Sequence, residues 1–273
     1  MDLVHDLVQS GGRLRAHRDI PAMSDVFSIL IIALAFLLAG FVKGVIGLGL
    51  PTVSLGLLSL VMTPAQAAAI LIVPSLVTNS WQLVGPNFGP LLRRLGPMAA
   101  SVMVGALLGA VVLPTDSSGR ATISLGIALV VYALLGLSNV RFSAPQSAEF
   151  WLGPLVGILT GVVTAATGVF VIPALPYLQA IGLQRDDLVQ ALGIHFTISI
   201  FALTAVLAIT GVLQSSLSGG WLLYASLAAL VPALLGMRIG QFARSRISPD
   251  VFRVCFFIGM LALGTHLALR GWL

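Results

Sequence analysis

The stretch Gly40-Phe-Val-Lys-Gly-Val-Ile-Gly-Leu-Gly-Leu-Pro51 decides how this chain folds. It lies in an apolar run from Val26 to Met62 in which Lys43 is the single charged residue. As one helix the run would measure roughly 55 Å, whereas the hydrocarbon of a bilayer is roughly 30 Å thick. Because glycine loosens a helix and proline removes a backbone donor, we expect the helix to break in this stretch. Unpaired peptide groups in a membrane must be buried in protein or line a watery cavity, so the break also predicts a substrate site.

The composition is that of an integral membrane protein. Of the 273 residues, 58% are hydrophobic and 8% are charged, against about a quarter charged in soluble domains. The chain has room for about eight membrane helices and for no separate soluble domain. The net charge of +5 comes from arginines in short loops rather than from a continuous basic stripe, which argues against nucleic acid as a partner. The only cysteine, Cys255, lies in an apolar block, so no disulfide framework, metal site or cofactor is predicted.

Seven further apolar blocks follow the broken one. They are Ala65–Val84, Pro97–Leu113, Ala121–Val140, Phe150–Ile181, Leu188–Val212, Gly220–Met237 and Val251–Leu269. Residues 1–22 lack the apolar core of a signal peptide and are expected to form a loose tail at the cytoplasmic side or the surface. Met23 stands directly before the first block and is an alternative start of the protein.

The fifth block repeats the oddity of the first. It is also too long for one span, and its glycines precede Pro173 and Pro176. An offset of 121 residues places Gly40 on Gly161 and Gly47 on Gly168, and brings Pro51 within one residue of Pro173. With a slightly larger offset, Gly105-x-x-x-Gly109 meets Gly236-x-x-x-Gly240. We therefore predict an all-α polytopic membrane protein with about eight transmembrane blocks in two four-block repeats, residues 23–142 and 143–273, with the first block of each discontinuous.

The positions of lysine and arginine leave two topologies open. With eight simple crossings and the N-terminus inside, Arg93 and Arg94 lie inside while Arg244 and Arg246 lie outside, against the positive-inside rule. If each broken block instead enters the membrane and returns, the two halves are inverted relative to one another. Arg93, Arg94, Arg141, Arg185, Arg244 and Arg246 then all face the cytoplasm. We favour this second arrangement, although each limb of a broken block would be short for a full crossing.

The polar residues within the blocks favour an anion as the ligand. All nine acidic residues lie in the tail, in loops or at helix ends, so Lys43 is the one ionisable group deep in the broken block. A buried lysine beside unwound amides attracts an anion; the alternative is that Lys43 extends to the membrane interface.

Two sets of polar residues are candidates for a pathway. Thr78 and Asn79 lie in the second block, and His195 and Ser199 lie four residues apart in the sixth. His195 could equally well bond a carbonyl of a neighbouring helix, and serine and threonine also join membrane helices. The Gly-x-x-x-Gly pairs and Gly153-x-x-x-Gly157-x-x-x-Gly161 indicate close helix packing.

The order and repetition of these glycine patterns resemble the sulfite exporter TauE/SafE family of membrane transporters. The residues that carry the resemblance are Gly40 to Pro51, Gly161 to Pro173 and Gly236-Met-Arg-Ile-Gly240. This sequence departs from the family's run of consecutive glycines at Leu48 and Leu50. The resemblance implies a multi-pass protein of the bacterial inner membrane that exports small sulfur-containing anions, such as sulfite or organosulfonates, and that is coupled to an ion gradient.

A passive anion channel is the alternative, and a membrane-embedded enzyme is less well supported because His195 has no intramembrane carboxylate partner. The expected partners are a small anion, the lipid bilayer and a second copy of the chain in a homo-oligomer. The candidate substrate-binding residues are Lys43, Gly47, Gly49, Pro51, Thr78, Asn79, Gly168, Pro173, His195 and Ser199.

Overall fold

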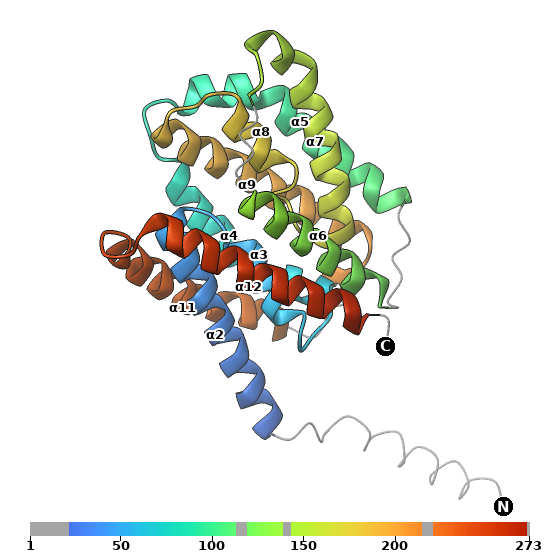
Figure 1. Cartoon of the computed structure of the whole chain (residues 1–273). Coiled ribbons are helices and arrows are strands. Elements are labelled where there is room, and N and C mark those ends of the chain that lie inside the picture. Colours follow the sequence, from blue (N-terminus) through green and yellow to red (C-terminus); the bar gives the residue numbers. More distant parts are fainter. Residues whose placement is uncertain (1–21, 113–118, 139–142, 215–220, 272–273) are drawn as a thin grey trace, which may run out of the picture.

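The computed structural model describes residues 22–112, 119–138, 143–214 and 221–271, and the regular elements in these ranges are helices (Figure 1). The predicted N-terminal tail lies almost entirely outside these ranges. The helices are α2 (Ala22–Ile46), α3 (Leu50–Leu58), α4 (Pro64–Leu83), α5 (Phe88–Val112), α6 (Arg120–Leu137), α7 (Gln146–Thr167), α8 (Ala174–Ala180), α9 (Arg185–Ile209), α11 (Trp221–Ala243) and α12 (Pro249–Arg270).

Seven of these helices are long and apolar enough to cross a membrane. They are α2 from Phe27 onward, α5, α6, α7, α9 from Asp186 onward, α11 and α12 from Asp250 onward. The all-helical, multi-pass membrane architecture predicted from the sequence is thus confirmed. The second predicted block is also helical: α4 has 20 residues, but it is less apolar than the other seven. Its polar residues are concentrated near its C-terminal end, at Ser75, Thr78, Asn79 and Gln82.

Both predicted breaks are present. The helix α2 ends at Ile46, and Gly47 and Gly49 then take left-handed conformations with φ of +82° and +103°. In the other half, α7 ends before Gly168, whose φ is +73°. Side chains strongly disfavour this region of φ, which explains why glycines mark the breaks. The following helices α3 and α8 have nine and seven residues, or about 14 and 11 Å, so neither crosses the membrane.

The chain reverses at the first break. Gly49 lies against Val42 of the preceding helix. The start of α12 lies beside α2, where the rings of Phe41 and Phe252 are 5.9 Å apart. From there α3 and α12 continue in the same direction, because Gly49 contacts Phe256, Gly56 contacts Leu263, and Arg270 donates a hydrogen bond to the carbonyl of Leu60. The helix α3 therefore runs back toward the side from which α2 came.

The second break reverses the chain in the same way. The hydroxyl of Tyr177 in α8 lies beside Gly153 near the start of α7. One turn later, the amide of Ala144 donates a 3.0 Å hydrogen bond to the carbonyl of Ala180. The helix α8 therefore ends where α7 begins. Each half of the chain thus contains a long helix followed by a short helix that turns back.

Glycines bring the long helices into backbone contact. A Cβ on Gly40 of α2 would collide with the carbonyl of Ala233 in α11, and one on Gly236 would collide with that of Leu37. The pair α5 and α7 meets in the same way: a Cβ on Gly105 would strike Ile158, and one on Gly161 would strike Val102. The prediction that the Gly-x-x-x-Gly pairs are close-packing faces is confirmed. Each broken long helix therefore packs against a helix of the other half.

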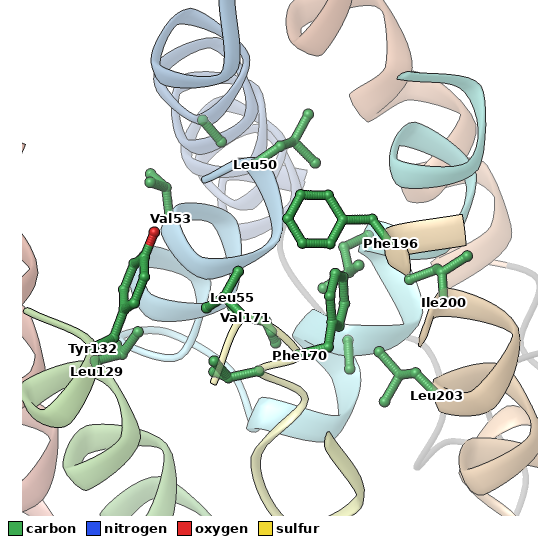
Figure 2. Close-up of a cluster of buried hydrophobic side chains, with 14 of the residues drawn as sticks. Leu50, Val53, Leu55, Leu129, Tyr132, Phe170, Val171, Phe196, Ile200 and Leu203 are labelled. Carbon is green, nitrogen blue, oxygen red and sulfur yellow. The ribbon is translucent and has the colours of Figure 1, made fainter. Parts of the chain in front are cut away.

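The main hydrophobic core surrounds α3 and the second break. Figure 2 shows Leu55 of α3 beside Val171, with Leu50 nearer Phe196 and Val53 nearer Tyr132. Gly168 lies directly against Leu55. The second break therefore packs against α3, the short helix that follows the first break, and both breaks contribute to one core. The reversal of α3 explains this, because it places the helix between the two turns.

Arginines gather at one end of the helices, which we call the arginine end. The starts of α5, α7, α9 and α12 and the end of α8 lie there. Arg94 of α5 forms a two-point ion pair with Glu149 of α7, with N–O distances of 2.6 and 2.8 Å, and also bonds the carbonyl of Ile181 after α8. Arg253 bonds the carbonyl of Gly136 at the end of α6. Arg141 lies outside the described residues.

Candidate functional site

Lys43 is buried inside the bundle, one helical turn before the first break. Its side chain is 3% exposed, which contradicts the alternative that it extends to the membrane interface. Its Nζ donates hydrogen bonds to Thr78 Oγ1 at 3.1 Å and to Asn79 Oδ1 at 2.5 Å, both on α4. Both partners are neutral and fully buried. Because a buried charge without an opposite charge is costly, this arrangement leaves a strong attraction for an anion.

The local structure of α4 turns these two acceptors toward Lys43. Pro74 lies inside α4 and has no amide hydrogen, so the carbonyl of Ile70 loses its helical partner. Ser226 of α11 replaces that partner with a 2.7 Å hydrogen bond to the Ile70 carbonyl. The hydroxyl of Thr78 donates to the carbonyl of Pro74 at 2.7 Å, which directs its oxygen lone pairs outward to accept from Lys43.

Two polar atoms on α4, in the lysine's partner Asn79 and in Ser75 one turn earlier, have no hydrogen-bond partner. They are Nδ2 of Asn79 and Oγ of Ser75, and both atoms are buried. Since the amide oxygen of Asn79 accepts from Lys43, its NH₂ group must point elsewhere, where it offers two hydrogens. Nearly all buried polar atoms in proteins are paired with protein or with water or a ligand. The unpaired donors therefore mark a place for something bound.

Gln82 is part of this site and was missed by the sequence analysis. Its Nε2 donates a 2.6 Å hydrogen bond to the carbonyl of Gly47, one of the groups freed by the break. Its Cβ also lies against Gly193 of α9. Gln82 follows Trp81 at the end of an apolar block, which is typical of a residue at the membrane interface. Its spacing of three and four residues from Asn79 and Thr78 was the signal that could have revealed it.

At the second break, a histidine rather than a glutamine bonds a backbone carbonyl of the broken segment. The carbonyl of Phe170 lies 2.8 Å from Nε2 of His195 on α9, and Ser199 Oγ lies 3.5 Å from the same nitrogen. His195 thus bonds a backbone carbonyl, which was one of the two roles predicted for it. This carbonyl belongs to the second break. Thr164, which the 121-residue offset places on Lys43, is buried and bonds the carbonyl of Thr160 in its own helix.

The structure therefore divides the predicted residues into two groups. The first joins the broken segment with its neighbour on α4 and contains Lys43, Gly47, Gly49, Pro51, Thr78 and Asn79. The second joins the other break with α9 and contains Gly168, Pro173, His195 and Ser199. Thr78, Asn79, His195 and Ser199 all lie inside the bundle, since each is at most 4% exposed. Their role as substrate ligands stays a prediction.

The charges around the site are uneven. Among the described residues the one ion pair is Arg94–Glu149, at the arginine end. The described residues contain no cluster of three metal-binding side chains. A shallow hollow lined by Gly89, Pro90, Arg93 and Arg94 also lies at the arginine end and includes none of the candidate residues. Lys43 is thus the cation that the buried site offers, and α4, which accepts its hydrogen bonds, also carries the unpaired donors of Asn79 and Ser75.

Comparison with known proteins gives one match. A protein-family model matches residues 32–267, a range that includes both breaks and every candidate residue. No curated protein and no solved structure matches the chain.

Proposed function

The chain belongs to the sulfite exporter TauE/SafE family, whose model matches residues 32–267, and from this premise we propose that it is a secondary transporter that exports small sulfur-containing anions. Sulfite and organosulfonates are the substrates we have in mind, and the bacterial inner membrane is the proposed location. The observation that carries the proposal is the buried Lys43 ammonium, which is bonded to neutral groups at the end of a broken helix.

The chemistry of the site suits an oxyanion. Lys43 supplies a positive charge, and Asn79 Nδ2 and Ser75 Oγ supply hydrogen-bond donors that lack a partner. A sulfite or sulfonate group carries several acceptor oxygens and one or two negative charges, so it can accept from all three. Charge-assisted hydrogen bonds of this kind are about twice as strong as neutral ones. A cation would meet the ammonium instead, and no described carboxylate contacts it.

The arrangement of helices supports transport by alternating access. The first helix of the first half, α2, packs against α11, the third long helix of the second half, and α7 packs against α5 in the corresponding way. In both halves the chain reverses direction at the break. We interpret the halves, residues 23–142 and 143–273, as two four-block repeats of inverted orientation. In this interpretation α4 is a membrane block in addition to the seven long apolar helices, which makes eight. Transporters built this way bind substrate at the junction of the repeats, where discontinuous helices lie. With the arginine end in the cytoplasm, this arrangement also satisfies the positive-inside rule.

The test is a flux assay with purified protein in lipid vesicles. We expect sulfite to cross the vesicle membrane faster than in empty vesicles, and an imposed proton gradient to change its final distribution. Flux that only equalises the two sides, whatever the gradient, would indicate the passive channel. Sulfite flux no greater than in empty vesicles would contradict the proposed substrate.

Two variants link the flux to the site. Lys43→Ala is expected to abolish most sulfite flux at equal protein content, and Lys43→Arg to recover part, because a guanidinium keeps the charge but does not fit the place of an ammonium. The matched control is Arg238→Ala, which removes a cation from a membrane helix at an exposed position over the ring of Trp81. Wild-type flux in Lys43→Ala would show that the lysine does not bind the anion.

A further inference from the structure

Three buried, unpartnered polar atoms lie on one face of α4. Among the described residues, five buried side-chain atoms have no hydrogen-bond partner, and three of these belong to Ser75, Asn79 and Gln82. Their spacing of four and three residues places them within about 60° of arc around the helix. We call this surface the α4 polar face. Since unpaired buried polar atoms are rare in folded proteins, three in one line call for a common cause.

The opposite side of α4 is apolar and exposed. Val77 and Trp81 are 40% and 63% exposed, and both lie about half a turn from the α4 polar face. In its C-terminal half the helix thus turns Val77 and Trp81 outward and its polar face inward. Serine, asparagine and glutamine are expensive inside a membrane unless they meet a protein group or water. The atoms without a protein partner are therefore expected to meet water.

Space for that water exists beside the break. Gly47 is half-buried, and a Cβ built on it would meet no atom within 4 Å; its carbonyl is bonded by Gln82. By contrast, a Cβ built on Gly44, one turn earlier, would collide with the carbonyl oxygen of Met237 in α11. An opening at Gly47 thus adjoins one end of the α4 polar face.

We propose that the α4 polar face lines a hydrated pathway that leads past Lys43, with Gln82 and Ser75 as pathway residues on either side of it. The proposal rests on the proposed function for the identity of the anion, but not for the existence of the pathway. Gln82 lies toward the arginine end, and Ser75 lies about 10 Å farther along the helix. An anion that leaves the ammonium of Lys43 would find the hydroxyl of Ser75 about one turn away.

The experiment measures the reactivity of single cysteines. Cys255, the one cysteine of the chain, lies exposed on α12 and is first replaced by serine. Ser75→Cys and Gln82→Cys are then introduced separately into the purified protein and treated with a methanethiosulfonate reagent that carries a sulfonate group. Ser54→Cys and Ser226→Cys are the matched controls, because these serines are equally buried but bond the backbone carbonyls of Leu50 and Ile70.

We expect Ser75→Cys and Gln82→Cys to react at least about tenfold faster than the controls, because a thiol in a wet site ionises and a thiol in an apolar site does not. An added organosulfonate, which unlike sulfite does not attack the reagent, should slow the reaction. Each variant is compared by its elution from a sizing column, so that a misfolded protein is recognised. Reaction of Ser75→Cys at the rate of the controls, in a folded protein, would overturn the pathway.

The outcomes separate this proposal from the proposed function. Fast labelling without protection by the organosulfonate, in a protein that shows no sulfite flux, supports the pathway and contradicts small sulfur-containing anions as the substrate. Sulfite flux together with an unreactive Ser75→Cys supports the proposed function and contradicts the pathway along α4.

Discussion

At the scale of single residues, the site depends on neutral groups that hold a charge without cancelling it. Lys43 is bonded to a hydroxyl and an amide rather than to a carboxylate. A carboxylate would stabilise the buried lysine more strongly, but it would also remove the attraction for an anion. Asparagine at position 79 therefore favours anion binding more than it favours the stability of the fold.

The variant Asn79→Asp tests this choice. The two side chains have almost the same shape, so we expect the protein to fold, with the new carboxylate paired to Lys43. Anion transport should fall by at least about tenfold, since one unit of buried negative charge now competes with the substrate. The control Gln66→Glu makes the same change at the start of the same helix, where Gln66 caps Thr63 and an acid is favourable. Sulfite flux at the wild-type level in Asn79→Asp would refute the role of Lys43 as a free cation.

The hydroxyl of Ser226 is predicted to stabilise the kink at Pro74. The change Ser226→Ala leaves the carbonyl of Ile70 buried and unpaired, which costs about 1–3 kcal/mol in the free energy of unfolding. We expect a lower midpoint of thermal unfolding in detergent. Ser80→Ala serves as the control, because Ser80 is exposed and bonds a carbonyl of its own helix. Equal midpoints for the two variants would contradict the prediction.

At the scale of the elements, glycine has two separate uses. In the breaks it permits a left-handed backbone, as at Gly47 and Gly168. In the long helices it permits backbone contact, as between Gly240 and Phe41. Both uses were predictable: the first from glycine beside proline in a run too long for the bilayer, and the second from the four-residue spacing.

Backbone contact at the α2–α11 crossing makes it sensitive to a single methyl group. We predict that Gly240→Ala lowers the free energy of unfolding by about 1–3 kcal/mol, because the new Cβ would overlap the carbonyl of Phe41. Gly259→Ala in α12 is the matched control, since a Cβ there meets nothing within 4 Å. Alanine also favours a helix over glycine, so the control should be neutral or slightly stabilising. The measurement is thermal unfolding of both variants; equal stability would mean that the helices separate without cost.

Other features of the elements could not be predicted. The reversal of α3 depends on contacts with α12, some 200 residues later, and no local pattern carries that information. The pairing of Lys43 with Thr78 and Asn79 depends on the register between α2 and α4. Both sets of residues were identified by their chemistry, but their contact follows from the turn between them. Gln82 was missed because its partner is a backbone carbonyl, which any sequence offers.

At the scale of the whole molecule, most of the described arginines gather where four helices begin, whereas Arg120 and Arg270 lie at the opposite end. Arg93 and Arg94 precede the apolar part of α5, and Arg244 and Arg246 follow α11. The reversal of α3 and α8 brings these loops to one side, which simple crossings of every block would not do. The sequence analysis favoured this arrangement on the positive-inside rule, and the contacts of α3 and α8 supply its structural reason.

Labelling of intact cells tests the orientation. In the Cys255→Ser background, Ser245→Cys lies at the arginine end and Val61→Cys lies at the opposite end, and both positions are exposed. We expect a thiol reagent that does not cross membranes to label Val61→Cys in whole cells and to label Ser245→Cys only after the cells are opened. The reverse pattern would place the arginine end outside and contradict the proposed topology.

The packing of α2 against a helix of the other half affects the order in which the protein folds during synthesis. The glycine face of α2 packs against α11, which the ribosome completes almost 200 residues later. At about 5–20 residues per second, α2 waits in the lipid for roughly 10–40 s before its partner exists. Throughout that interval Gly40 and Gly44 of α2 lack their final neighbours on α11. The nascent first half is therefore incompletely packed and is exposed to the proteases and chaperones of the cell. Its packing is completed only when the last quarter of the chain has been synthesised.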